Sequence, residues 1–133
     1  MLAVISLVVA SASAHTYYMD LIPNGHNVPN PCGGSAWLAV GHYDPTHHTH
    51  DKNQFGLDFK NAGHQWTKTL CQMDSDKDGQ SNGVELGDPN CTWTPGTPAP
   101  QPATGHPGIC NPVGSCAGQS FSCGCHGHNC VGK

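Results

Sequence analysis

The chain has 133 residues, with five lysines, no arginine and nine acidic residues, which gives a formal net charge of −4 at pH 7. So little positive charge excludes a protein that binds nucleic acid through the phosphate backbone. From His15 onward only 15 of 119 residues are Leu, Ile, Val or Phe, too few for burial alone to stabilise a fold. Glycine (17) and proline (11) are abundant, so long helices are disfavoured.

The first 14 residues are typical of a signal peptide. An apolar run, Leu2 to Val9, is followed by Ala12-Ser13-Ala14, whose small side chains suit signal peptidase. The run is too short to span a bilayer, and no later segment is apolar enough to do so. We therefore expect an extracellular, secreted protein that begins at His15, or at Ser13 if cleavage follows Ala12.

Eight cysteines in an oxidising compartment predict four disulfides, each worth about 2–4 kcal/mol. Their connectivity stays open, because eight cysteines allow 105 pairings. Three cysteines precede a proline-rich stretch and five follow it, so complete internal pairing requires at least one bridge between the two parts. In chain order the cysteines are Cys32, Cys71, Cys91, Cys110, Cys116, Cys123, Cys125 and Cys130.

The composition divides the chain into segments. After the signal peptide (1–14) we expect a folded domain at 15–94, a proline-rich spacer at 95–109 and a tail rich in cysteine and histidine at 110–133. Within the domain, residues 16–22 form either a short helix or a strand. Pro23-Asn24-Gly25 then predicts a turn.

Two short helices are expected in the middle of the domain. The first, over 53–61, has Asn53 as its N-cap, Phe55 and Phe59 four residues apart on one face, and Gly63 as its stop. The second, over 65–73, places Trp66 and Leu70 on one face.

The segment from Asp74 to Glu85 matches the calcium-loop pattern D-x-D-x-D-G-x5-E without a gap. Calcium takes six to eight hard oxygen ligands, and alternating acidic residues supply them, while Gly79 permits the sharp bend. The expected ligands are Asp74, Asp76, Asp78, the backbone carbonyl of Gln80, Asn82 through a water, and Glu85 as a bidentate carboxylate.

This loop has no second copy in the chain. Ser81 occupies the position where paired loops usually carry an aliphatic residue, and Gly87-Asp88-Pro89 ends the outgoing helix early. We therefore expect a single structural calcium site with a dissociation constant of about 10⁻⁴–10⁻³ M, not a calcium switch. Four of the nine acids lie in the loop, so without a cation their charges repel one another.

Several segments combine rare residues in a fixed order. They are Ile-Pro-Asn-Gly (22–25), Val-Pro-Asn-Pro-Cys (28–32), Asn-Gln-Phe-Gly-Leu-Asp-Phe (53–59) and the run 74–93. This order resembles the temptin family over about residues 15–94. The resemblance implies a small, secreted, cysteine-bridged protein of the pheromone type that acts by binding other secreted or cell-surface proteins.

The ten histidines raise a different hypothesis. If cleavage follows Ala14, the amine and ring of His15 could hold copper together with His42 or His64, as in the histidine brace of lytic polysaccharide monooxygenases. The alternative function is thus a copper-dependent oxidative enzyme. His47, His48 and His50 could chelate zinc or copper but are interpreted mainly as part of a solvated polar loop. His126 and His128 have zinc-like spacing to nearby cysteines, but secretion favours disulfides over thiolate ligands there.

Together these patterns predict a small, disulfide-rich, mostly irregular fold with short α-helices and a single EF-hand-like calcium loop. The favoured function is a non-catalytic, calcium-binding, extracellular binding or signalling module. Catalysis by paired carboxylates is disfavoured, because Glu85 is the only glutamate and belongs to the calcium loop. The enzyme hypothesis requires His15 at the amino terminus and one bound copper, whereas the binding hypothesis requires neither.

Overall fold

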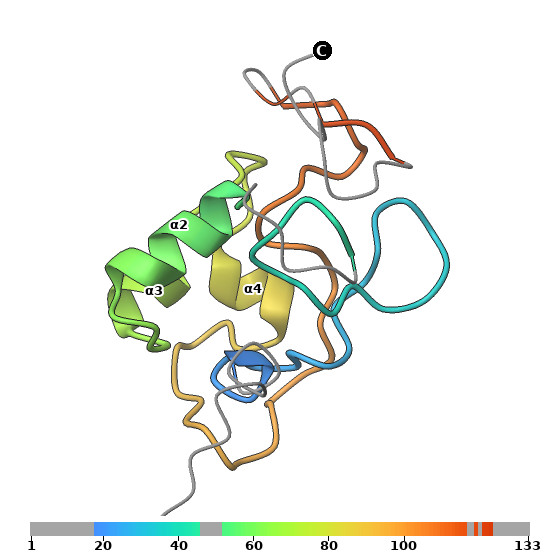
Figure 1. Ribbon diagram of the computed structural model, residues 1–133. Helices are drawn as coiled ribbons and strands as arrows, with labels where there is room; N and C mark the ends of the chain where they lie inside the picture. Colours follow the sequence, from blue (N-terminus) through green and yellow to red (C-terminus); the bar gives the residue numbers. More distant parts are fainter. Residues whose placement is uncertain (1–17, 46–51, 117–118, 120, 124–133) are drawn as a thin grey trace, which may run out of the picture.

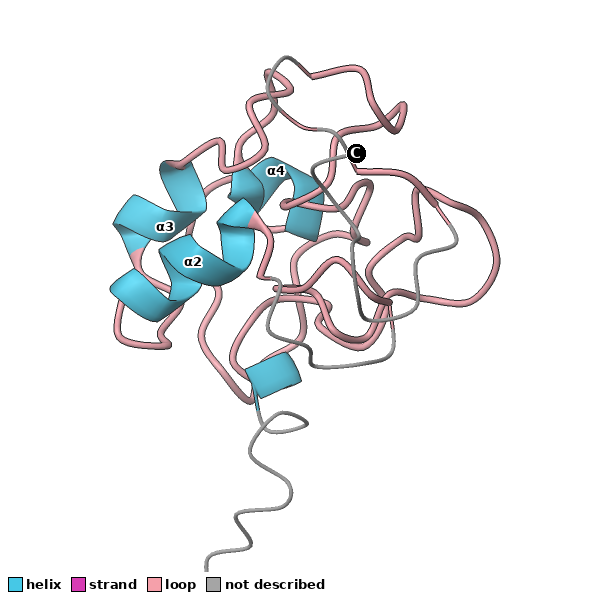
Figure 2. Cartoon of the chain, turned by 45° about the horizontal axis from the view of Figure 1, so that its top comes forward, coloured by secondary structure: helices cyan, strands magenta, loops and turns pink. Residues whose placement is uncertain are grey.

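The computed structural model describes residues 18–45, 52–116, 119 and 121–123. Its helices are α2 (Gln54–Asn61), α3 (Lys68–Gln72) and α4 (Asn82–Leu86). Loops and turns make up most of the rest, and the described residues form no strand beyond an isolated bridge between His42 and Lys52 (Figure 2). The expected small, mostly irregular fold with short helices is confirmed. Within the described ranges, no helix has both the length and the hydropathy to cross a membrane.

Helix α2 forms where its capping residues predict it. The side chain of Asn53 accepts a hydrogen bond from the backbone N–H of Gly56 at 2.9 Å and so caps the first turn. Phe55 and Phe59, one turn apart, are both buried. Gly63 follows the helix with a positive φ of 75°, which a residue with a Cβ adopts at a cost.

Helix α3 is shorter than expected. It begins at Lys68 instead of near Gln65, because the hydroxyl of Thr67 accepts from the backbone N–H of Leu70 at 3.0 Å and caps the helix there. Trp66 therefore lies outside the helix, where its indole N–H donates to a carboxylate oxygen of Asp88 at 2.9 Å. The predicted start of this helix, which included Trp66, is therefore wrong.

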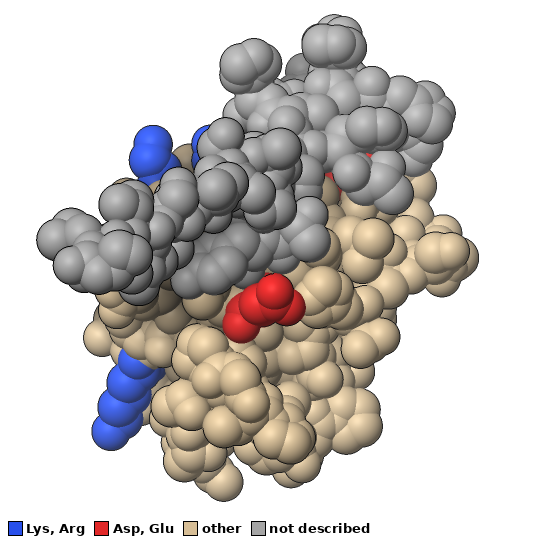
Figure 3. All heavy atoms as spheres, turned by 60° about the horizontal axis from the view of Figure 1, so that its bottom comes forward, with Lys and Arg blue, Asp and Glu red and all other residues tan. Residues whose placement is uncertain are grey.

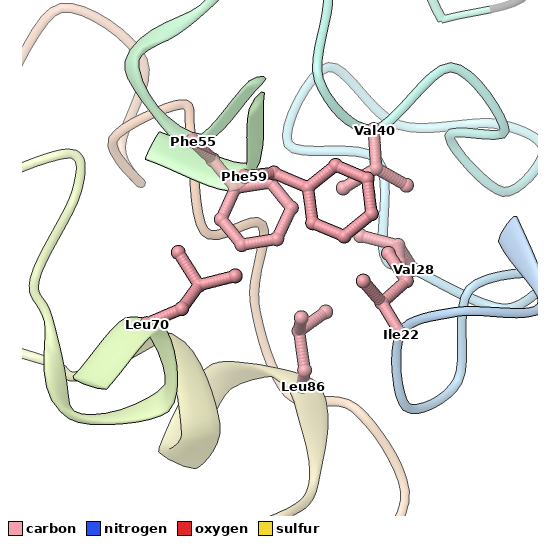
Figure 4. Close-up of a cluster of buried hydrophobic side chains, with 7 residues drawn as sticks. All are labelled: Ile22, Val28, Val40, Phe55, Phe59, Leu70 and Leu86. Carbon is pink, nitrogen blue, oxygen red and sulfur yellow. The ribbon is translucent and has the colours of Figure 1, made fainter. Parts of the chain in front are cut away.

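The main core lies where the helices meet the loops that precede them (Figure 4). Phe55 and Phe59 from α2 face Leu70 of α3 and Leu86 of α4. The remaining members are aliphatic residues from the loops before α2, namely Ile22, Val28 and Val40. Seven side chains make a thin core, in agreement with the low aliphatic content.

A second, smaller cluster joins distant parts of the chain. It contains Trp37, Ile109 and Phe121, all buried. The ring of His106 meets Trp37 edge-on, with centroids 4.8 Å apart, and is itself fully buried. Ile109 comes from the proline-rich spacer, so the far end of that spacer is part of the packed structure.

Three disulfides occur in the described part of the chain: Cys32–Cys123, Cys71–Cys91 and Cys110–Cys116. The first joins the folded domain to the tail and confirms that at least one bridge links the two parts. Cys71–Cys91 ties the end of α3 to the segment that follows α4. Cys125 and Cys130, expected to complete the set, lie outside the described residues.

The proline-rich segment runs back along α4 (Figure 1). The backbone N–H of Gln101 donates to the carbonyl of Gly87 at 3.0 Å, and that of Thr104 donates to the carbonyl of Glu85 at 2.8 Å. Residues 106–110 are then buried. The segment therefore covers α4 and meets the carbonyl groups at its end, which its composition did not indicate.

Truncating the core should destabilise the protein far more than truncating the surface of the same helix. Leu86→Ala is expected to lower the free energy of unfolding by about 2–5 kcal/mol, because it leaves a cavity beside Leu70 and Phe59. Val84→Ala, at a residue of α4 that is 38% exposed, should change it by less than about 0.5 kcal/mol. Urea unfolding with the disulfides intact measures both; equal losses would show that α4 does not pack into this core.

Burial of His106 should make the protein less stable in acid. Desolvation lowers the pKa of His106 to about 3, against 6.5 in the unfolded chain. Between these two pH values the imidazole of His106 is protonated in the unfolded state but not in the folded state. The contribution of His106 to stability therefore falls as the pH drops from 6.5 toward 3.

The variant His106→Asn keeps an acceptor for the backbone N–H of Gly108, which donates to Nδ1 at 3.0 Å, but cannot titrate. It should show a shallower loss of stability over that pH range in urea titrations. Identical slopes for wild type and His106→Asn would contradict the buried, neutral state of His106.

Candidate metal centre

The acidic loop at 74–85 connects α3 and α4, which pack against each other. It turns sharply at Lys77 and Gly79, both with positive φ (63° and 94°). Its backbone N–H groups point inward to its own carboxylates: Gly79 donates to Asp74 at 2.9 Å and Gln80 donates to Asp78 at 2.9 Å. The loop is thus wrapped around its acidic side chains.

The loop brings three predicted ligands together. Single carboxylate oxygens of Asp74, Asp76 and Asp78 all lie within 4.8 Å of one another. Asp76 is buried, whereas Asp74 and Asp78 are half-buried. Gln80, which is expected to contribute its backbone carbonyl, is an exposed residue.

Glu85 approaches this cluster from α4. It is 4% exposed, and burial, followed by the negative charges of Asp76 and Asp78, raises its pKa to about 10. Burial, followed by the charge of Asp78, likewise raises the pKa of Asp76 to about 8. The fold therefore holds carboxyl groups together in a place where their ionised forms repel one another.

Two oxygens of these groups are buried without a hydrogen-bond partner: Oδ2 of Asp76 and Oε1 of Glu85. Leaving polar atoms buried and unpaired costs on the order of a few kcal/mol for each atom. A divalent cation would neutralise the repulsion and give both oxygens a ligand role, and a set of carboxylate oxygens is the type that calcium prefers. The residues present therefore fit a calcium ion.

Asn82 is engaged in holding the loop closed. Its amide nitrogen donates to the backbone carbonyl of Leu70 and to the hydroxyl of Ser75, both at 2.9 Å. Its amide oxygen accepts from the backbone N–H of Ser75 at 3.3 Å. These bonds join the start of the loop to its end, so Asn82 holds the loop closed. Its water-mediated contact with calcium stays a prediction.

The proline-rich segment completes the surroundings of the site. A Cβ added at Gly105 would lie only 3.1 Å from Oε2 of Glu85, so this residue packs directly on the carboxylate. Sγ of Cys110 lies 3.0 Å from the backbone oxygen of Asp76. The loop pattern could not have revealed these contacts, because they come from residues far along the chain.

Asp88 is a further buried carboxylate, outside the acidic loop. The sequence indicated it only as part of the signal that ends the helix. It is fully buried and accepts hydrogen bonds from the indole N–H of Trp66 and from the backbone N–H groups of Trp93 and Thr92. Its partners satisfy both carboxylate oxygens. Asp88 therefore organises the turn after α4 and does not resemble the unpaired carboxyl groups of the loop.

The copper hypothesis gains no support from the described residues. His15 lies outside them. His42 is buried and His64 is half-buried, and both line one cavity beside α2. Among the described residues, the side chains that could together hold a metal are the three aspartates of the acidic loop, and no histidine joins them.

The raised pKa values have a measurable consequence in metal-free protein. Asp76 and Glu85 hold protons in the folded state that the unfolded chain, with pKa values of 3.8 and 4.5, has already released. Their contribution to stability is therefore complete below about pH 4 and is lost as the pH rises through 8 toward 10.

Melting temperatures recorded in chelator across this range should fall with increasing pH. Glu85→Gln, which imitates the protonated carboxyl group, should flatten the decline. If Glu85→Gln melts with the same pH dependence as wild type, the carboxylate of Glu85 is not buried beside other acids.

Comparison with known proteins identifies the family. The Temptin C-terminal family model matches residues 12–109, and so includes the proline-rich segment that we expected to lie outside the resemblance. Temptin from Aplysia californica is 52% identical over 114 residues, which span 84% of this chain and 90% of the relative. No solved structure matches the chain. With a family model that covers most of its length and a relative of this similarity, the chain belongs to the temptin family.

Proposed function

We propose that this chain is a secreted signalling protein of the temptin type, which acts by binding other secreted or cell-surface proteins. The observation that carries the proposal is the 52% identity to Aplysia temptin over nearly the full length of both chains. The signal-peptide pattern at residues 1–14 and the disulfides both suit an oxidising, extracellular environment.

We further propose that the acidic loop binds one calcium ion. Asp74, Asp76 and Asp78 would hold it together with Glu85 and the carbonyl oxygen of Gln80. The supporting observation is the pair of buried, unpartnered oxygens on Asp76 and Glu85, two carboxyl groups whose pKa values are raised by burial and by neighbouring acids of the loop. Without a cation, these groups retain protons or repel one another.

Calcium in this position would act on the fold and not on a reaction. The loop joins α3 to α4, and the segment 101–105 packs on Glu85 from the other side. An ion here would fix both elements and, through residues 106–110, the second hydrophobic cluster. On the face in Figure 3 the described surface carries few charges, as suits contacts made by uncharged groups.

Calcium should stabilise the oxidised protein. With a dissociation constant of about 10⁻⁴–10⁻³ M, 10 mM calcium adds about 1.4–2.7 kcal/mol to the free energy of unfolding. Asp76→Asn should remove most of this gain, because it replaces a charged ligand in the centre of the loop. Asp20→Asn, the same change at an exposed aspartate outside the loop, should keep it.

Thermal melts with calcium, magnesium and chelator measure the effect, and isothermal titration gives the stoichiometry. One ion per chain is expected, with the largest shift for calcium. Equal melting temperatures in calcium and chelator would disprove the calcium proposal while leaving the family assignment intact.

The signalling proposal is tested separately. The tagged protein is incubated in the medium into which the source cells secrete, and bound proteins are identified in the presence of calcium or chelator. Specific secreted partners that Asp76→Asn recovers poorly, and Asp20→Asn recovers normally, would join the two proposals. Partners recovered equally in every condition would support signalling without a calcium requirement, and no partner in any condition would count against it.

A further inference from the structure

A cavity of about 140 Å³ lies beside α2, away from the acidic loop. Phe55 and Phe59 of α2, together with Ile22 and Val40 from the preceding loops, contribute to its wall. These four residues also belong to the main core drawn in Figure 4, so the cavity borders that core. A cavity of about 150 Å³ with similar walls accommodates benzene in an engineered protein, so this one has room for a single aromatic ring.

Three basic residues also line the cavity. Lys52 is exposed at the edge of the cavity, and the rings of His42 and His64 also line it. Of the lining residues in the described part of the chain, none is acidic. The positive charge of Lys52 can therefore meet an anionic group at the edge of the cavity.

The wall of the cavity is fixed before any ligand arrives. The side-chain amide of Asn53 donates to the backbone carbonyls of Val40 at 2.7 Å and His42 at 3.0 Å, which ties the preceding loop to α2. A Cβ at Gly41 would lie 2.9 Å from the Cα of Gly56, so the two backbones are in direct contact. On the opposite side, Tyr18 stacks on His64 with centroids 4.7 Å apart. A preformed wall lowers the entropic cost of binding.

We propose that this cavity binds a small monocarboxylic acid whose apolar body is about the size of one aromatic ring. The apolar body occupies the space beside Phe59 and Val40, and the carboxylate lies at the edge near Lys52. The site shares no residue with the acidic loop, so it stands or falls independently of calcium binding.

Phenylacetate is a suitable probe, and phenylacetamide and phenethylamine are its neutral and cationic counterparts. Titrations of the full secreted chain, oxidised and calcium-loaded, are followed by ¹H–¹⁵N correlation spectra. Phenylacetate should bind with a dissociation constant of about 1 mM and shift the amide signals of Gly41 and Gly56. It should bind about threefold more tightly than phenylacetamide, with phenethylamine the weakest.

Two kinds of variant test separately how the charge of Lys52 and the volume of the cavity contribute to the affinity for phenylacetate. Lys52→Gln should bring the affinity for phenylacetate down to that for phenylacetamide, whereas Lys60→Gln, an exposed lysine of α2 outside the lining, should preserve the threefold preference. Val40→Phe, which fills the cavity, should abolish binding of both ligands. Because Val40→Phe also perturbs the core, its spectrum must show a folded protein before its loss of binding is counted.

Three outcomes would overturn the proposal. They are the absence of shifts around α2 at 10 mM phenylacetate, equal binding of the acid and the amine, and an acid preference that survives Lys52→Gln. If only apolar side chains presented by a protein partner enter the cavity, the first of these is observed. If calcium binding fails but phenylacetate binds as expected, the metal proposal is lost and this one stands.

Discussion

The burial of mutually repelling carboxyl groups between α3 and α4 is the constraint on which much of the structure depends. Asp76 and Glu85 each have an oxygen that is buried and unpaired. Burial and the charges of neighbouring acids raise the pKa of both carboxyl groups. Such an arrangement is unfavourable unless protons or a cation compensate for it. Two neighbouring contacts hold these carboxyl groups in position. The hydrogen bonds of Asn82 close the loop, and Gly105 packs against the carboxylate of Glu85.

In the part of the chain that the structure describes, the burial of apolar side chains contributes little free energy to offset that cost. Seven buried side chains form the main core and three form the second cluster, so covalent links must restrict the unfolded chain where burial is insufficient. Cys71–Cys91 links α3 to the segment that follows α4, and Cys32–Cys123 links the domain to the tail. The proline-rich segment adds hydrogen bonds along α4 and delivers His106 and Ile109 to the second cluster. It is a structural strap, although its composition is that of a linker.

These features suit a secreted protein that presents a rigid surface. The chain belongs to the temptin family, and its acidic loop, disulfides and second cluster would all hold loops in shape without a regular sheet. The cavity beside α2 gives such a scaffold a second possible task, the recognition of a small acid. The cavity and the acidic loop share no residue.

The sequence by itself determined the features that depend on neighbours in the chain. Asn53 and the spacing of Phe55 and Phe59 specify α2, Gly87 ends α4, and the run from Asp74 to Glu85 contains its ligand types at the required intervals. Only the tertiary structure decided which groups lose their contact with water. The start of α3 depends on Thr67 and on the hydrogen bond between Trp66 and Asp88, and the neutral state of His106 depends on Trp37. Capping and turn geometry involve residues a few positions apart, whereas desolvation depends on which distant segments pack together, and no local pattern records that.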